Sequence, residues 1–406
     1  MNKFNKLQDC VVTNKNVIVR VDINVPLKDE EIQDDTRIRA VIPTLKYLAQ
    51  NKAKVIVLSH IGRPKGKKND EMSVKHVVQR VSQLLEDVKV NFVDDCVGPK
   101  VEEAVKNTQY GEVILLENIR FYDEETKNDP EFSKKLASLG NLYVNEAFSC
   151  SHRSHASITG IAEILKPAAG FLMEKELENL GKIFNNSGDQ KLIAIVGGAK
   201  VSTKIDLLNS LTSKAKTIVV GGGMANTFLY ALGNNIGNSL CEKDLKDTAL
   251  KIIETAKDNG CELFLPKDVV VTKEFKDGAD SEIINANNVA DNDIIADMGP
   301  ESVKELGEIL KQHQILVWNG PVGAFELKPF NIGTESLAKI VAQMTRNNEL
   351  VSVSGGGDSV SALTQAGVIN DFSYISTAGG AFLEWLEGKE LPGVAVLSSG
   401  SLGTSL

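Results

Sequence analysis

The chain has 406 residues and a formal net charge of −9 at pH 7, with 42% hydrophobic and 24% charged residues. This length suits about two domains, and the composition is that of an ordinary globular protein. The negative charge would repel a polyphosphate backbone, and aromatic residues make up only 5%, so we expect no nucleic-acid partner.

The first residues, MNKFNKLQDCVV, contain no apolar core of a signal peptide, and no run approaches the roughly 20 apolar residues that a membrane helix needs. The five cysteines have no C-x-x-C spacing, which fits a reducing compartment better than a disulfide framework. We therefore expect a cytoplasmic protein that makes no membrane contact.

Short runs rich in Val and Ile alternate with helical stretches along the whole chain. The runs are NVIVRVDINVP, KVIVLSH, KVNFVDD, VILLENIRF, NLYVNEAF, LIAIVGGAK, TIVVGGG, LFLPKDVVV, ILVWNGPVG and LVSVSGGG. Such runs are typical of parallel strands buried on both faces. Between them, segment 74–85 has apolar residues at helical spacing, so the pattern predicts an α/β protein with parallel sheets.

The two halves of the chain carry different residues directly after each predicted strand. A predicted helix at 171–184, with a linker-like Asn/Ser/Gly/Asp cluster after it, separates them. In the first half, Arg or His comes after the strands, and in the second half glycine motifs do so: GGAK, GGGMAN, NGPVG, GGGDS and TAGG. Ligands of doubly wound folds bind at the carboxyl ends of strands. The first half is thus predicted to bind a small anion, and the second to hold phosphate with backbone N–H groups.

The stretch SCSHRSHAS, residues 149–157, would fit either a metal site or an anion site. Zinc sites usually have about four ligands in two spaced pairs, and the second pair is missing. Arg153 inside the ligand set would also repel a dication. Guanidinium groups bind carboxylate and phosphate bidentately, so the stretch is interpreted as part of an anion site.

The second half contains neither G-x-x-x-x-G-K-[ST] nor G-x-G-x-x-G, which excludes a P-loop enzyme and an ordinary dinucleotide-binding protein. Asp358 in GGGDS is either a helix N-cap or a Mg²⁺ ligand. Lys200 and Lys204 are predicted on one face of a helix that begins after the glycines, either solvated or directed at phosphoryl oxygens.

Ten motifs occur in order along the chain: RVDINVP (20–26), LSHIGRP (58–64), LLENIRF (115–121), YVNEAFSCSHRSHAS (143–157), AGFLMEKEL (169–177), VGGAKVSTKI (196–205), VVGGGMANTFL (219–229), VWNGPVGAFE (317–326), GGGDS (355–359) and LEGKELPGV (386–394). By these motifs the sequence resembles the phosphoglycerate kinase family over essentially its whole length. The resemblance implies an α/β fold of two Rossmann-like, doubly wound parallel-sheet domains joined by a hinge helix.

The resemblance also implies the division of the chain and its reaction. Residues 1–170 would bind the triose, 171–185 would form the hinge helix, 186–388 would bind the nucleotide, and 389–406 would pack back on the first domain. The implied enzyme is a monomer that moves a phosphoryl group reversibly between 1,3-bisphosphoglycerate and ADP, giving 3-phosphoglycerate and ATP, with Mg²⁺ as cofactor.

The resemblance assigns the site residues through the motifs. The triose would be bound by Asp22, Asn24, Arg37, His60, Ile61, Gly62, Arg63, Arg120, His152 and Arg153. The nucleotide would be bound by Gly198, Ala199, Lys204, Gly222, Asn319, Pro321, Glu326, Gly356, Gly357, Asp358 and Ser359. Asp358 would hold the metal, and Arg37, Lys200 and Lys204 would be catalytic.

Four residues depart from the family pattern. Ser359 stands for a common Thr and keeps the hydroxyl, Tyr374 stands for His, Glu146 for the usual Asp, and Ala378 for the first glycine of a TGGG turn. A positive φ at Ala378 would be strained.

An acyl phosphate leaves as a carboxylate and the attacking ADP oxygen is already ionised, so no strong general base is expected. The reaction would need in-line positioning and charge cancellation, and a hinge closure near 171–190 and 376–380 that excludes water. Two alternatives remain: a two-lobed phosphotransferase for another carboxylated phosphate, and a catalytically silent nucleotide-binding scaffold. The joint presence of Arg37, Lys200, Lys204 and Asp358 argues against the scaffold.

Overall fold

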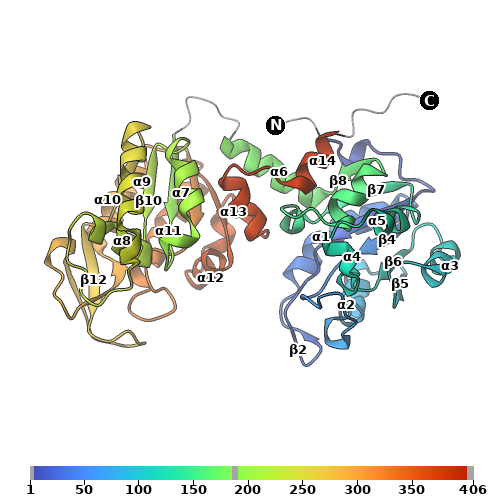
Figure 1. The fold of residues 1–406 in the computed structure, drawn as a ribbon, viewed down its shortest axis with the longest axis horizontal. Helices are drawn as coiled ribbons and strands as arrows, with labels where there is room; N and C mark the ends of the chain where they lie inside the picture. The colour runs from blue at the N-terminus through green and yellow to red at the C-terminus, as the bar shows by residue number, and fades with distance from the viewer. Residues whose placement is uncertain (1–3, 185–190, 400–406) are drawn as a thin grey trace. The chain divides into compact units, whose positions relative to one another are not determined.

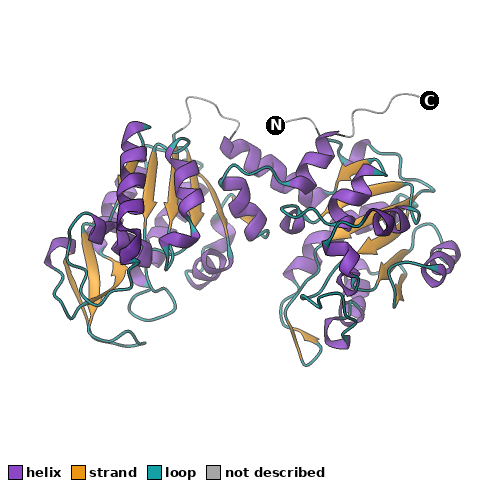
Figure 2. Ribbon diagram, in the orientation of Figure 1, coloured by secondary structure: helices purple, strands orange, loops and turns teal. Residues whose placement is uncertain are grey.

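The computed structural model describes residues 4–184 and 191–399. Its chain divides into two compact units (Figure 1). Unit 1 runs to Glu178 and includes the segment from Glu390 onward, and unit 2 runs from Asn179 to Lys389. Helices flank a parallel sheet in each unit, as Figure 2 shows, so the predicted α/β architecture with two parallel sheets is confirmed.

Unit 1 contains a six-stranded parallel sheet in the order β5-β6-β4-β1-β7-β8. The strands are β1 (Asn16–Val21), β4 (Lys54–Leu58), β5 (Val90–Val93), β6 (Val113–Leu116), β7 (Leu142–Glu146) and β8 (Pro167–Ala169). The helices are α1 (Thr36–Gln50), α2 (Lys75–Leu85), α3 (Pro99–Asn107), α4 (Asp123–Thr126), α5 (Pro130–Ala137) and α14 (Pro392–Ser399). Helix α6 (Phe171–Phe184) begins in unit 1 and ends in unit 2, and β2 (Leu27–Lys28) and β3 (Glu31–Ile32) form a hairpin.

The strands of unit 1 are apolar on both faces because helices cover both. Val17 and Val19 of β1 pack into one buried cluster with residues of α1 and α2, whereas Ile18 packs into a second cluster with residues of α3 and α5. Successive side chains of a strand point to opposite faces, so one uninterrupted Val/Ile run serves both clusters.

Unit 2 contains a parallel sheet in the order β11-β10-β9-β15-β16-β17 and a separate antiparallel sheet in the order β13-β12-β14. The strands are β9 (Leu192–Val196), β10 (Thr217–Val220), β11 (Glu262–Phe264), β12 (Asp268–Thr272), β13 (Ser281–Asn285), β14 (Ile294–Met298), β15 (Ile315–Asn319), β16 (Val351–Gly355) and β17 (Tyr374–Ser376). The helices are α7 (Ile205–Thr212), α8 (Gly222–Ala231), α9 (Lys246–Asp258), α10 (Pro300–Leu310), α11 (Ile332–Arg346), α12 (Gly357–Gln365) and α13 (Gly380–Leu386).

The run LFLPKDVVV, taken from the sequence as one strand, forms two. β11 ends at Phe264 and β12 begins at Asp268, with Pro266 between them. Proline has no N–H to donate to a sheet, which ends the pairing of β11. β12 then pairs with β13 and β14 in the antiparallel sheet.

Helix α14 packs within unit 1. The backbone N–H of Gly393 donates to the carbonyl oxygen of Ser151 (2.9 Å), and the Asn145 side chain donates to the carbonyl oxygen of Gly393 (3.0 Å). A Cβ at Gly393 would lie 2.7 Å from both Ser151 Oγ and Ile158 Cγ2, so this close approach requires glycine. Of the predicted C-terminal tail at 389–406, residues 400–406 lie outside the described residues.

Ala378 does not adopt the strained conformation considered above. The left-handed φ in this turn falls on the next residue, Gly379, at 49°. Ala378 is buried, and its N–H donates to Ser376 Oγ (3.2 Å). The alanine therefore fits the turn without backbone strain.

The carboxylate of Glu146, at the end of β7, holds the beginning of α6. It accepts hydrogen bonds from the backbone N–H groups of Leu172 (3.0 Å) and Met173 (3.1 Å) and from the Thr44 hydroxyl of α1. A Cβ at Gly170 would lie 2.1 Å from Glu146 Oε2, so the glutamate needs a glycine there. Burial raises the pKa of Glu146 to about 7 despite these three donors.

This raised pKa predicts a pH-dependent stability. Between about pH 4.5 and 7 the folded chain keeps a proton on Glu146 that the unfolded chain has lost, so the free energy of unfolding should fall by at most about 3 kcal/mol as pH rises through this window. Urea midpoints measured across the window should flatten in Glu146→Gln relative to wild type. Glu178→Gln, a change at an exposed position of α6, should keep the wild-type slope of urea midpoint against pH. Equal slopes in all three proteins would contradict the prediction.

Across residues 4–184 and 191–399, no helix combines the length and the apolar character that crossing a bilayer requires. All five cysteines are free thiols, and three of them are buried: Cys96, Cys150 and Cys261. Burial raises the pKa of each of these three thiols, so they are neutral apolar side chains at ordinary pH.

Candidate functional site

In unit 1, the predicted anion-binding residues lie on loops at the carboxyl edge of the sheet. Asp22 and Asn24 follow β1, His60 to Arg63 follow β4, Arg120 follows β6, and His152 and Arg153 follow β7. β1 lies between β4 and β7, so its loop is flanked by the loops of two neighbours that are distant in sequence. Carboxyl ends of parallel strands meet at one edge, which brings these loops together.

Hydrogen bonds tie several of these residues to one another. Arg37, in the first turn of α1, pairs through Nη1 with Asp22 Oδ2 (2.9 Å) and also donates to the carbonyl oxygen of Asn24 (3.2 Å). The Asn24 side chain accepts from the N–H of Gly62 (2.9 Å), and Arg120 Nη1 donates to the carbonyl oxygen of Gly62 (3.0 Å). Gly62 has φ of 64°, and a Cβ there would meet Met72 Sδ at 2.8 Å.

The loops carry more positive charge than they neutralise. Burial and the nearby Arg20 lower the pKa of Arg120 to about 10, and burial with the charge of Arg153 lowers the pKa of His152. Arg120 Nε and His152 Nδ1 are buried without a hydrogen-bond partner. A buried guanidinium and a partly buried imidazole, each with an unpaired nitrogen, suit an anionic ligand that carries several oxygens.

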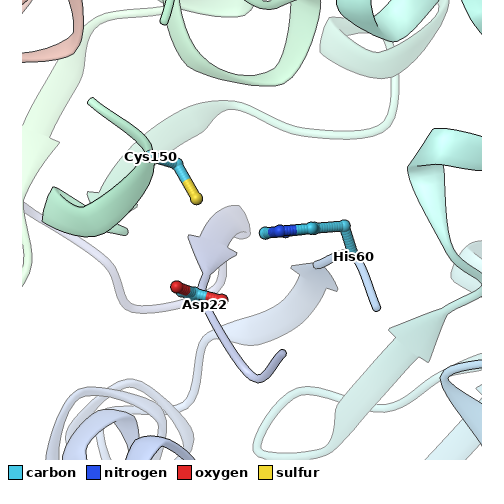
Figure 3. A group of neighbouring side chains, drawn as sticks. All are labelled: Asp22, His60 and Cys150. Atoms are coloured by element: carbon cyan, nitrogen blue, oxygen red, sulfur yellow. The ribbon is translucent and has the colours of Figure 1, made fainter. Parts of the chain in front are cut away.

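Asp22, His60 and Cys150 form a possible ligand set for a metal, with ligand atoms all within 4.8 Å of one another (Figure 3). However, Arg20 Nη2 lies 3.1 Å from His60 Nδ1 and 3.9 Å from Cys150 Sγ, and Arg37 pairs with Asp22. A dication would meet two guanidinium charges here, and burial keeps the thiol protonated. The cluster fits an anion better than a metal ion.

In unit 2, the chain order of the parallel sheet reverses between β9 and β15. From β9 the next strands along the chain, β10 and β11, lie on one side of it, and the later strands β15, β16 and β17 lie on the other. In doubly wound folds a ligand crevice forms at such a reversal of strand order. Gly198 follows β9 with φ of 125°, and Gly222 opens α8 with φ of 63°. A Cβ at Gly222 would lie 2.8 Å from the carbonyl oxygen of Gly198, so the two loops approach each other closely through their backbones.

A pocket opens at this edge of the sheet. Among the predicted nucleotide-binding residues, those that line it are Gly198, Ala199, Gly222, Pro321, Glu326 and Asp358. Its apolar lining includes Leu240, Phe275 and Ile295, which belong to none of the predicted motifs. Leu240 and Phe275 are 52% and 57% exposed, and exposed large apolar residues around a concave pocket suit a planar apolar ligand group.

Lys204 lies beside the pocket rather than among its lining residues. Its Nζ donates to the carbonyl oxygens of Gly197 (2.6 Å) and Asn319 (3.0 Å). Burial lowers the pKa of Lys204 to about 8, and the charge of Asp358 opposes this shift. The ammonium has only neutral partners here, so an incoming anion would gain a strong partner.

The prediction that Lys200 and Lys204 share one face of a helix is wrong. Residues Val201–Thr203 form a single 3₁₀ turn, and α7 begins only at Ile205. Lys204 has φ of −135° and ψ of 15°, which is not helical. The two lysines flank this turn, and Lys200 is exposed whereas Lys204 is mostly buried.

The GGGDS motif forms the beginning of α12. Gly356 is the N-cap with φ of 98°, and Asp358 lies in the first turn with its carboxylate exposed at the pocket. Ser359 Oγ accepts from the N–H of Gly320 (2.7 Å), and Asn319 Nδ2 donates to the carbonyl oxygen of Gly355 (2.8 Å). One exposed carboxylate at a helix N-terminus suits Mg²⁺ that is shared with phosphate oxygens.

The family model and the related sequences match this chain over nearly its whole length. The family model described as phosphoglycerate kinase matches residues 7–389. A phosphoglycerate kinase of Rhodospirillum centenum is 50% identical over 396 residues, which cover 98% of this chain and 100% of that protein. One of Chelativorans sp. is 51% identical over 400 residues, again covering 98% and 100%.

Two solved structures share the fold over nearly the full length. Phosphoglycerate kinase of Coxiella burnetii has a TM-score of 0.90 and 39% identity, and that of Pyrococcus horikoshii has a TM-score of 0.81 and 32% identity. Each alignment covers 98% of this chain and 99% of the other.

Proposed function

The chain belongs to the phosphoglycerate kinase family, and from this we propose how its residues divide the work of the reaction between the two units. The enzyme is a phosphotransferase of glycolysis with a carboxyl group as acceptor. It moves a phosphoryl group reversibly between 1,3-bisphosphoglycerate and ADP, giving 3-phosphoglycerate and ATP.

In our proposal, unit 1 binds the triose at the carboxyl edge of its sheet. The ligand carries a phosphate and a carboxyl or acyl phosphate group, and the loops provide several arginines, of which Arg120 has an unpaired Nε. The triose-binding set is Asp22, Asn24, Arg37, His60, Ile61, Gly62, Arg63, Arg120, His152 and Arg153. The single observation that carries this proposal is the buried Arg120, whose Nε has no partner and whose pKa is lowered to about 10.

Arg63 provides a test of the triose assignment. It lies exposed in the loop after β4, so Arg63→Ala removes a ligand contact at little cost to stability. We expect the KM for 3-phosphoglycerate to rise about tenfold while the KM for ATP stays unchanged, measured by initial rates. Lys67→Ala, an exposed change four residues along the same loop, serves as the control, and a selective rise in the KM for ATP would contradict the assignment.

Unit 2 binds the nucleotide at the crevice between β9 and β15. Backbone N–H groups and Lys204 meet the phosphates, and the apolar residues of the pocket accept the base. The nucleotide-binding set is Gly198, Ala199, Lys204, Gly222, Asn319, Pro321, Glu326, Gly356, Gly357, Asp358 and Ser359. Asp358 would hold Mg²⁺, which when bound neutralises phosphate charge.

In this proposal the side chains stabilise the negative charge of the transferred phosphoryl group, and none of them acts as a general acid or base. The attacking oxygen is already ionised in either direction, on ADP or on the carboxylate of 3-phosphoglycerate, and the leaving group departs as an anion, so no side chain has to move a proton. Arg37, Lys200 and Lys204 are the proposed catalytic residues, which offset the charge on the phosphoryl group in flight. Lys204 would leave its two carbonyl partners and donate to the phosphoryl oxygens instead.

We further propose that the enzyme works as a cytoplasmic monomer and that closure of its two units precedes transfer. Free cysteines throughout the chain fit a reducing compartment. The closure is proposed at 171–190 and 376–380, of which 185–190 lie outside the described residues. Small-angle scattering should give a smaller radius of gyration with both substrates bound, and identical profiles with and without substrates would contradict closure.

One assay tests the proposal as a whole. Purified protein with 3-phosphoglycerate, ATP and Mg²⁺ should produce 1,3-bisphosphoglycerate, read as NADH oxidation by its dehydrogenase. Turnover should stop when Mg²⁺ is chelated and return when it is restored. Turnover that persists without any divalent cation would contradict the proposed role of Asp358.

A further inference from the structure

Arg20, in β1, is completely buried beneath the triose-binding loops. A buried guanidinium needs acceptors for its N–H groups, because unpaired buried charge is costly. Its Nε donates to Ser157 Oγ (2.8 Å), its Nη1 donates to the carbonyl oxygen of Val21, and its Nη2 lies 3.1 Å from His60 Nδ1. The third contact reaches a proposed triose-binding residue.

The position of Arg20 is fixed from behind by a buried carboxylate. Glu125 is fully buried and accepts from the hydroxyl (2.7 Å) and the backbone N–H (2.9 Å) of Ser157. Burial raises the pKa of Glu125, but the nearby His155, the charge of Arg20 and the hydrogen bond from Ser157 outweigh it and lower the pKa below its usual value. Glu125 is therefore ionised, and Ser157 links its charge to that of Arg20.

A guanidinium group can only donate hydrogen bonds, so His60 Nδ1 must accept the one from Arg20. An accepting Nδ1 carries no proton, and the neutral imidazole then has its proton on Nε2. We propose that Arg20 is a positioning residue that holds His60 as the neutral Nε2–H tautomer, so that His60 presents a donor to an oxygen of the triose. This inference rests on the proposed role of His60 in triose binding.

The surroundings of His60 favour the same state. The charged and titratable groups that surround it are Arg20, Arg37, Arg120 and His155, and Asp22 and Cys150 lie beside it (Figure 3). Burial, followed by the charge of Arg20, holds the pKa of His60 well below its usual value. His60 therefore contributes a directed hydrogen bond, whereas the arginines contribute the charge that binds the anion.

The decisive measurement uses the wild-type enzyme. In protein labelled with ¹⁵N-histidine, two-dimensional spectra between pH 6 and 8 should show His60 with a protonated Nε2 and an unprotonated Nδ1 throughout, assigned by comparison with His60→Gln. A protonated Nδ1 at His60 within this range, as either the other tautomer or imidazolium, would overturn the proposal.

Two variants separate positioning from packing. Arg20→Met removes the donor and should populate the Nδ1–H tautomer and raise the KM for 3-phosphoglycerate about tenfold, leaving the KM for ATP unchanged. Arg20→Lys keeps a group that only donates and should retain the Nε2–H tautomer. An unchanged tautomer in Arg20→Met would overturn the role of Arg20, and if this variant fails to fold, the wild-type spectrum still decides.

The proposed function and this inference can fail separately. If His60→Gln leaves the KM for 3-phosphoglycerate unchanged, the assignment of His60 to the triose is wrong, whatever its tautomer. If that KM rises but the wild-type spectrum shows a protonated Nδ1, triose binding by His60 stands and positioning by Arg20 is overturned.

Discussion

Replacing Lys204 by alanine is expected to lower kcat about 100-fold or more while leaving the thermal unfolding temperature nearly unchanged. The ammonium is mostly buried and donates to two backbone carbonyl oxygens, those of Gly197 and Asn319. A charge held in a largely dry position without an ionic partner gains a much stronger partner when it exchanges neutral carbonyl oxygens for phosphoryl oxygens. Its loss therefore removes stabilisation that acts on the transition state.

The test compares kcat and both KM values of Lys204→Ala with those of Lys251→Ala in the coupled assay. Lys251 is an exposed lysine on α9 of the same unit, so its replacement should leave all three constants at wild-type values. Wild-type kcat in Lys204→Ala would refute the catalytic role. A raised KM for ATP with unchanged kcat would reduce Lys204 to a binding residue.

Replacing Arg37 by alanine is expected to lower kcat/KM for 3-phosphoglycerate by about 10²–10³-fold. The guanidinium pairs with Asp22 at 2.9 Å, and the Asp22 side chain is only 9% exposed. The substitution thus removes one cationic donor and also leaves a buried carboxylate without its ionic partner among the residues proposed to receive an anion. Both effects oppose triose binding, and neither acts on the nucleotide.

Arg39 offers a matched control two residues along the same helix. It is 57% exposed and pairs with Asp35 through an i,i+4 contact, which contributes little to stability. Arg39→Ala should retain kcat/KM for 3-phosphoglycerate within about twofold. If kcat/KM falls as far as it does in Arg37→Ala, the overall positive charge of the unit, rather than the position of Arg37, determines triose affinity.

The Val/Ile runs predicted the parallel strands because helices cover both faces of each sheet, and no polar face interrupts the pattern. The antiparallel strands β13 and β14 gave a weaker signal, since four of the five residues of β13 are exposed. The strand orders could not be read at all, because they depend on which distant segments pair. The run around Pro266 was predicted as one strand because apolar residues lie on both sides of the proline, but Pro266 separates β11 from β12.

The candidate site was predictable where residues belong to motifs and not where tertiary packing brings them together. Gly198, Gly222 and Gly356 have positive φ, which is the physical reason for the glycines in three of the motifs. Leu240 and Phe275 line the same pocket from segments without a motif. What marks these two residues as part of the site is that their large apolar side chains are exposed, and exposure is known only once the chain is folded.

The chain passes from unit 1 into unit 2 and returns to unit 1 with α14, which has a consequence for synthesis. Unit 2 is one continuous segment, but unit 1 gains α14 only when the segment from Glu390 onward has left the ribosome. Until then the Asn145 amide and the Ser151 carbonyl lack the partners that Gly393 provides. The part of the enzyme made first is thus completed last, because unit 2 ends at Lys389 whereas unit 1 still needs the segment from Glu390 onward.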